Sequence, residues 1–283
     1  MILGDFYCET VRDKHRIGKK MCETMMKLPS DNPSVSGIIA GMSNGRMWID
    51  ETHSPGIIVT YSYCVGGYGI VGDVDPYTDI ELKTVFDHLF DRLISEGEEW
   101  FEFSAEDPKI YNRLLSIYSD KEIESEEEYS YRRNTMYDSL TPLQEEIMIR
   151  TIDSDYIGKI KRHVFSNEEM FYERYIHSWK TEEDFLKYSK AMIAIKNERL
   201  VGIIFGSSNY ENVITVDIEV EEALRGQGIA TRLTQELVNC CAKENRSVQW
   251  DCTESNTISR NLVQKLAFTP LKKRPYYWFK IKG

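Results

Sequence analysis

Val213–Ala230 reads Val-Ile-Thr-Val-Asp-Ile-Glu-Val-Glu-Glu-Ala-Leu-Arg-Gly-Gln-Gly-Ile-Ala, and the expected fold follows from this stretch. Apolar and polar residues alternate from Ile214 to Val220, which predicts a strand. From Ile229 apolar residues recur at helical spacing, with no Gly or Pro before Arg246, which predicts a helix. Gly226 and Gly228 lie between the two and let backbone N–H groups turn toward one point at the helix N-terminus. Unpaired amides and the positive end of the helix dipole meet there, so the sequence predicts an anionic, nucleotide-bearing ligand.

Bulk composition narrows the class of protein. The length of 283 residues predicts about two domains. No apolar run approaches the roughly 20 residues of a membrane span, and the N-terminal Met-Ile-Leu-Gly-Asp lacks a signal-peptide core. We therefore expect a cytoplasmic protein with no membrane partner. A net charge of −11 makes nucleic acid a poor partner. The six cysteines show no CxxC spacing, so free thiols and no metal site are expected.

The chain also repeats itself. A shift of about 146 residues aligns Arg46–Asp50 with Met192–Lys196 and the helix pattern Ile80–Ile94 with Gly226–Cys240. The match is one of pattern, and two copies of one α/β unit account for it. We predict two tandem lobes, residues 1–140 and 143–283, joined near Ser139–Pro142 where proline interrupts the chain.

The two copies differ at the glycine turn. Asp79-Ile-Glu-Leu82 stands in the first copy where Arg225-Gly-Gln-Gly228 stands in the second. Carboxylates repel phosphate, and side chains obstruct the close approach that glycine permits. The first copy is therefore expected to have lost the anion site and to serve as a scaffold or a substrate wall. Gly67–Gly72 matches GxGxxG literally, but Asp73, Asp75 and Pro76 separate it from the helix, so a plain glycine-rich strand is expected.

With these residues in view, the second half resembles the GNAT N-acetyltransferase superfamily. Arg225–Ala230 fits the family's acyl-CoA signature, Gln/Arg-x-x-Gly-x-Gly/Ala, at every position, and Val220 precedes it by the usual five residues. A second family element follows as the strand Ser247–Cys252, then Asn256 with Ser259, and a close at Ala267-Phe268. The first half looks like a degenerate GNAT-like repeat. The two-lobed layout is similar to a bacterial branch that includes a zwittermicin-type self-resistance acetyltransferase.

The resemblance implies a mixed, mostly antiparallel sheet flanked by helices, with acetyl-CoA in a cleft between splayed strands as the acetyl donor. Its pyrophosphate would lie on the amides of the turn, and its pantetheine arm along the strand edge and near the second element. The implied binding residues are Ile218, Glu219, Val220, Arg225, Gly226, Gln227, Gly228, Ile229, Ala230, Asn256 and Ser259.

One family position departs from the pattern. Many members carry a tyrosine seven residues after the Asn, which protonates the departing thiolate, and Val263 occupies that position. Tyr276, Tyr277 or Cys252 could substitute, although aromatic packing also accounts for the tyrosines. Ala267 also replaces the usual glycine.

The expected chemistry is direct attack of a small amine on the acetyl thioester. An alkylamine of pKa about 10.4 is protonated at neutral pH, so its deprotonation costs on the order of 4 kcal/mol, and a base must help. Glu219 is the candidate base and Asp217 shares its face of the strand. Both acids are also explained as solvated residues of the polar face or as partners of a lysine. Asp251 and Glu254 are candidates for holding a cationic substrate.

Two charged segments and one alternative function complete the expectations. The acidic run Glu122–Glu128 is expected to face solvent. Lys272–Arg274 is expected to be a solvated basic loop, or to meet the 3′-phosphate of CoA. The alternative function is a non-catalytic acyl-CoA-binding regulator, which the missing tyrosine makes credible. The acceptor's identity and the oligomeric state are not encoded in any of these patterns.

Overall fold

One sheet runs through the whole molecule. A computed structural model describes residues 31–50, 53, 56–179 and 181–282. Within these, eleven strands hydrogen-bond in the order β1-β2-β3-β4-β11-β5-β10-β9-β8-β7-β6. Only the pairs β3–β4 and β9–β10 are parallel, so the predicted mixed, mostly antiparallel sheet is confirmed. The strands are β1 Gly45–Asp50, β2 Ile57–Ser62, β3 Gly67–Gly72, β4 Trp100–Ala105, β5 Glu124–Arg133, β6 Ile147–Thr151, β7 Ala191–Lys196, β8 Arg199–Tyr210, β9 Val213–Val220, β10 Ser247–Thr253 and β11 Thr269–Lys280.

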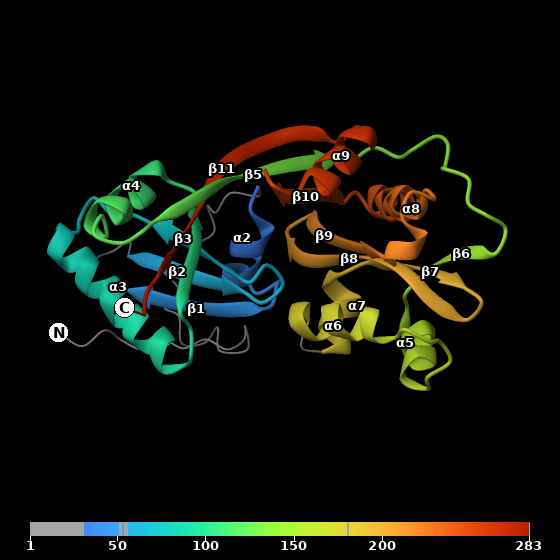
Figure 1. The fold of residues 1–283 in the computed structure, drawn as a ribbon, viewed down its shortest axis with the longest axis horizontal. Helices are drawn as coiled ribbons and strands as arrows, with labels where there is room; N and C mark the ends of the chain where they lie inside the picture. Colours follow the sequence, from blue (N-terminus) through green and yellow to red (C-terminus); the bar gives the residue numbers. More distant parts are fainter. Residues whose placement is uncertain (1–30, 51–52, 54–55, 180, 283) are drawn as a thin grey trace.

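Helices cover both faces of this sheet (Figure 1). They are α2 Pro33–Ala40, α3 Asp79–Ser95, α4 Pro108–Ile117, α5 Ser154–Lys161, α6 Glu169–Ser178, α7 Glu182–Tyr188, α8 Ile229–Lys243 and α9 Thr257–Lys265. In the C-terminal half, α8 and α9 pack with Trp250 and Val248 in one apolar core. On the opposite face, α5, α6 and α7 form a second core around Phe171, Trp179 and Phe185.

None of the helices among the described residues combines the length and the apolar character that a membrane span requires. Cys64, Cys240, Cys241 and Cys252 are free thiols. Cys8, Cys22 and the N-terminal Met-Ile-Leu-Gly-Asp lie outside the described residues.

The predicted repeat corresponds to a repeated order of elements. The order β1-β2-β3-α3-β4-α4-β5 recurs as β7-β8-β9-α8-β10-α9-β11. The last strands of the two copies are exchanged: β11 pairs with β4 and β5, while β5 pairs with β10 and β11. Figure 1 shows β5 and β11 side by side across the middle of the molecule. The lobe boundary between residues 140 and 143 remains a prediction, since each half lends a strand to the other.

Local sequence explains why only one of the two equivalent helices has an open N-terminus. At the start of α3, the Thr78 side chain accepts a hydrogen bond from the Glu81 amide, and the Glu81 side chain accepts one from the Thr78 amide. This capping box uses amides that a bound anion would need. At α8 the cap residue is Gly228, and no side chain caps the helix. The GxGxxG match at Gly67–Gly72 is strand β3, as expected.

Candidate active site

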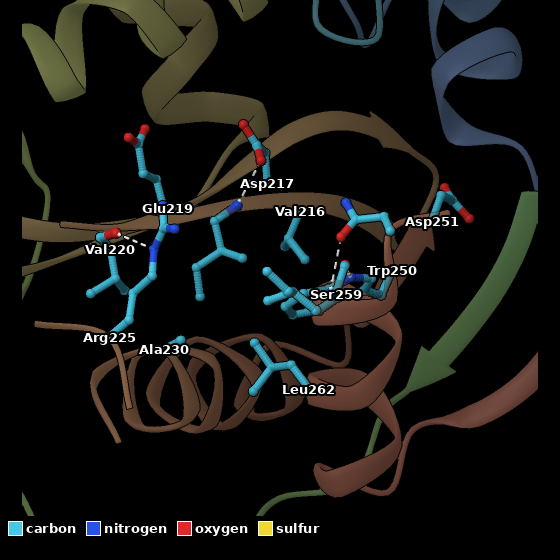
Figure 2. Close-up of a pocket in the computed structure, with 13 residues that line it drawn as sticks. Val216, Asp217, Glu219, Val220, Arg225, Ala230, Trp250, Asp251, Ser259 and Leu262 are labelled. Carbon is cyan, nitrogen blue, oxygen red and sulfur yellow. Dashed lines mark hydrogen bonds between the residues drawn. The ribbon is translucent and has the colours of Figure 1, made fainter. Parts of the chain in front are cut away.

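Strands β9 and β10 pair over a short distance and then separate. Their parallel pairing covers only Val213–Thr215 against Ser247–Gln249, whereas β9 continues to Val220 and β10 to Thr253. A cavity of about 320 Å³ lies between the two strand ends, with residues of α8 and α9 contributing to its lining. Figure 2 shows these side chains. The predicted binding residues that line it are Ile218, Glu219, Val220, Arg225, Ala230, Asn256 and Ser259.

The other predicted binding residues build the turn that leads into α8. Gly226 and Gly228 both adopt left-handed backbone conformations, with φ of 79° and 82°. Ile229 is 1% exposed and anchors the first turn in the core. The Gln227 Oε1 atom is buried and has no hydrogen-bond partner among the described residues. The Arg225 side chain donates to the Val220 carbonyl at 3.3 Å, which ties the turn to the end of β9.

This arrangement fits an acyl-CoA. The uncapped N-terminus of α8 presents amides and a positive dipole end to a diphosphate. A Cβ built at Gly226 would meet nothing within 4 Å, so the turn is open there. Between Val216 and Val220 the edge of β9 toward β10 has no strand partner among the described residues, which leaves it free for an extended pantetheine arm.

The second family element supports the cavity wall from α9. The Asn256 side-chain oxygen caps α9 by accepting from the Ser259 amide at 3.1 Å. The Ser259 hydroxyl accepts from Trp250 Nε1 at 2.7 Å, which joins α9 to β10. The carboxamide nitrogen of Asn256 does not take part in this cap and could donate to a ligand.

Glu219 and Asp217 project toward α6 and share one cation. Arg174 Nη2 lies 2.7 Å from Glu219 Oε2, and Arg174 Nε lies 3.2 Å from Asp217 Oδ2. Desolvation raises the pKa of Asp217, and the charge of Arg174 partly offsets that rise. Pairing with a lysine was one alternative for these acids; they do pair with a cation, but the partner is an arginine. The role of Glu219 as base remains a prediction.

Two charged segments were predicted wrongly. Lys272–Arg274 is not a solvated loop but part of β11, and the Arg274 side chain is only 4% exposed. The acidic run does not face solvent throughout, because the Glu128 side chain on β5 is 19% exposed and lies 3.2 Å from Arg274 Nη1. Burial, and then the charge of Asp251, raises the pKa of Glu128 to about 7.

This buried group of charges joins β5, β10 and β11, and it is what the sequence interpretation missed. Lys272 adds ion pairs to Asp31 and Glu106. Neither Glu124–Glu128 nor Lys272–Arg274 alternates in charge, so no period-2 signal marked these segments as strands.

Val263, which occupies the family's tyrosine position, is fully buried in the core beneath α8. The three candidates for protonating the thiolate in its place, Tyr276, Tyr277 and Cys252, lie outside the cavity lining. Tyr276 donates its hydroxyl to Glu102 at 2.6 Å, and Tyr277 packs on Phe103. Desolvation raises the pKa of the Cys252 thiol, which is part of the α8 core.

The first half of the chain reaches the polar side of this site. Cys64, in the connection between β2 and β3, has its pKa raised to about 11 by burial, while a hydrogen bond from Ser207 and the charge of Asp217 also act on it. Ser207 lies on β8 and Asp217 on β9. The β2–β3 connection therefore lies beside the carboxylate face of the second half.

Comparison with known proteins agrees with this geometry. The GNAT acetyltransferase family model matches residues 23–277. A GCN5-related N-acetyltransferase-like protein from Streptococcus suis superposes with a TM-score of 0.63 at 17% identity, covering 92% of this chain and 98% of that chain. A tandem GNAT protein from the clavulanic acid biosynthesis pathway superposes with a TM-score of 0.58 at 12% identity, covering 93% of each chain. These two similarities concern the fold.

One curated relative adds sequence similarity. An L-2,4-diaminobutyric acid acetyltransferase of Halalkalibacterium halodurans is 41% identical over 81 residues, which is 27% of this chain and 42% of the relative. The match therefore spans less than half of that relative's length. The family model, in contrast, covers nearly all of the chain. The chain belongs to the GNAT acetyltransferase family.

Proposed function

We propose that this protein transfers the acetyl group of acetyl-CoA to the amine of a small molecule by direct attack. One observation carries the proposal: the uncapped N-terminus of α8, the open edge of β9 and a cavity with carboxylates at its far side lie together. Family membership supports acetyl transfer, and the amine acceptor follows from the carboxylates.

Each part of the site has a role in this reaction. Acetyl-CoA supplies an activated acyl thioester. The amides of residues 225–230 hold its diphosphate, and the backbone of Ile218–Val220 aligns its pantetheine arm as an added strand would be aligned. The Asn256 carboxamide orients that arm from α9. Alignment of this kind turns a two-body encounter into a positioned one, which lowers the barrier to attack.

The acceptor approaches from the face that carries Asp217 and Glu219. A carboxylate there attracts the ammonium form of the amine and takes its proton, and the sequence predicts Glu219 for this step. Its ion pair with Arg174 must then open when the acceptor binds. The β2–β3 connection of the first half lies beside Asp217, and we propose that it borders the path by which the acceptor approaches.

The alternative is a non-catalytic acyl-CoA-binding regulator. Val263 favours it, because a buried valine occupies the position where many members carry the thiolate's proton donor. A thiol of pKa about 8.5 leaves tolerably as the thiolate at neutral pH, so the missing tyrosine does not rule out turnover.

The test combines binding and turnover. Acetyl-CoA is expected to raise the melting temperature, and Gly228→Glu to abolish the rise, because a carboxylate would occupy the anion site. Gly97→Glu is the matched control: Gly97 also has positive φ, at 100°, with nothing within 4 Å of a built Cβ. A rise that survives in Gly228→Glu would remove the proposed site. A panel of small amines is then expected to release CoA. Tight binding without any release would establish the regulator instead.

A further inference from the structure

We infer that Asp251 on β10, rather than Glu219 on β9, accepts the proton of the acceptor amine. This inference rests on the proposed acetyl transfer and assigns one residue of the same cavity.

The position of Asp251 relative to the point of strand separation is the first argument. Thr215 and Gln249 are the last paired residues of β9 and β10. Asp217 and Asp251 each lie two residues beyond, so by the period of a strand they share the face of Thr215 and Gln249. Both line the cavity, and Figure 2 shows both projecting to the side of the strands away from α8 and α9. Glu219 lies two residues farther from the separation point.

The partners of these carboxylates are the second argument. Asp217 and Glu219 are both ion-paired to Arg174, so accepting a proton would cost part of that attraction. Asp251 accepts hydrogen bonds from a neutral amide, Gln249 Nε2, at 3.0 and 3.1 Å to its two oxygens. The guanidinium groups of Arg274 and Arg132 act on it through their charge.

Gln249 itself is held in place. It is fully buried, and its Oε1 accepts from Arg132 Nη2 at 2.6 Å. The Asp251 carboxylate is thus oriented by a fixed amide and is not neutralised by it. Gln249 is accordingly a positioning residue.

The electrostatic surroundings are consistent with a base. Desolvation raises the pKa of Asp251, while the charges of Arg274 and Arg132 lower it. Glu128 on the adjacent strand faces the same group of charges. A carboxylate of raised pKa is better matched to an ammonium than an ordinary one.

The proton balance is simple. The ammonium gives one proton to the Asp251 carboxylate, and the free amine nitrogen forms its bond to the thioester carbonyl carbon. The carbon–sulfur bond then breaks and sulfur leaves as the thiolate, which takes the second proton that the nitrogen must lose. Asp251 finally releases its proton to solvent. The products are an amide, CoA thiol and one proton.

The experiment measures kcat/KM against pH for Asp251→Asn, Glu219→Gln and the wild type, with the best acceptor from the amine panel. Asp251→Asn is expected to lose about 100-fold at pH 7, the lower end of a general base's contribution. The loss is expected to shrink as pH approaches the acceptor's own pKa, because solvent then supplies the free amine. Asp155→Asn, at an exposed i,i+4 ion pair on α5, is the matched control and should leave the profile unchanged.

Two further measurements separate chemistry from folding. The acetyl-CoA melting shift is expected to persist in Asp251→Asn. Asp251→Glu keeps a carboxylate, so its kcat/KM at pH 7 is expected to exceed that of Asp251→Asn and to reach at least about a tenth of the wild-type value. If Asp251→Asn fails to fold, Asp251→Glu decides: a folded, acetyl-CoA-binding but inactive protein would overturn the role.

The outcomes distinguish this inference from the proposed function. If the wild type releases no CoA from any amine, both fall together. If the wild type is active and Asp251→Asn keeps its rate at pH 7, the Asp251 role alone falls. If Glu219→Gln instead shows the pH-dependent loss, the base is Glu219, as the sequence predicts.

Discussion

Ala267 adopts a backbone conformation that normally belongs to glycine. Its φ is 53°, and it follows the last turn of α9. The Phe268 amide donates to the Val263 carbonyl and the Ala267 amide to the Gln264 carbonyl, which is the hydrogen-bond pattern of a Schellman motif. The family's glycine suits this position, and alanine there is strained by its Cβ.

Ala267→Gly is therefore expected to stabilise the protein. Relief of the left-handed strain exceeds the entropy that glycine adds to the unfolded chain, for a net gain of about 0.5–1 kcal/mol. The melting temperature should rise by about 2 °C in a chain of this size. Ala242→Gly, inside the right-handed helix α8, is the control and should lower stability by a similar amount. Equal destabilisation by both changes would show that Ala267 is not strained.

At the scale of elements, the buried charges of β5, β10 and β11 make the centre of the sheet sensitive to pH. Glu128 has a folded-state pKa of about 7, raised by burial and by Asp251, from an ordinary 4.5. The folded state thus keeps a proton that the unfolded state has released across this window. Stability must fall as pH rises from about 4.5 to about 7.

Glu128→Gln is expected to remove this part of the pH dependence. Between pH 5 and pH 8 the free energy of unfolding of the wild type should fall relative to that of the variant. The expected fall is on the order of 1 kcal/mol per pH unit while the pH lies between the unfolded-state and folded-state pKa values of Glu128. Denaturant unfolding at the two pH values measures the difference. Glu124→Gln, an exposed change on the same strand, should follow the wild type. Parallel loss of stability in Glu128→Gln and the wild type would contradict the assignment.

Local patterns predicted the elements whose signals are local. Strand β9 ends at Val220 and helix α8 begins at Ile229, as the alternation and the glycine turn indicate. Helix α3 spans Asp79–Ser95, one residue longer at each end than the predicted Ile80–Ile94. The charged parts of strands β5 and β11 were harder to predict from the sequence. A run of charged residues looks like a solvated segment unless the opposite charges on the neighbouring strand are known. Arg274 is buried only because Glu106 and Glu128 lie beside it.

The candidate site also has parts that local sequence predicts and parts that it does not. The turn and the Asn256 element depend on short spacings, and both came from the family signature. The pairing of Arg174 with Glu219, and the approach of Cys64 to Asp217, join segments that are distant in the sequence. No periodicity or composition encodes such contacts.

At the scale of the whole molecule, the exchanged strands make each half depend on the other. In residues 143–283 alone, β10 would lose its antiparallel neighbour β5, and β11 would lose both of its partners, β4 and β5. The freed edges would expose backbone groups that pair in the intact chain, which favours aggregation. Loss of order in β10 would also displace part of the cavity wall, because the lining residues Trp250 and Asp251 lie on this strand.

We therefore predict that residues 143–283 expressed alone give no acetyl-CoA melting shift, although they contain the whole glycine turn. Co-expression with residues 1–140 is expected to restore the shift, since β5 can then pair with β10 from a separate chain. The control is the same co-expression with a first fragment that ends before β5, at residue 122, which should restore nothing. A lone second half that is soluble and binds acetyl-CoA like the full chain would show that the exchange is dispensable. The two halves would then be independent domains, joined at the predicted boundary.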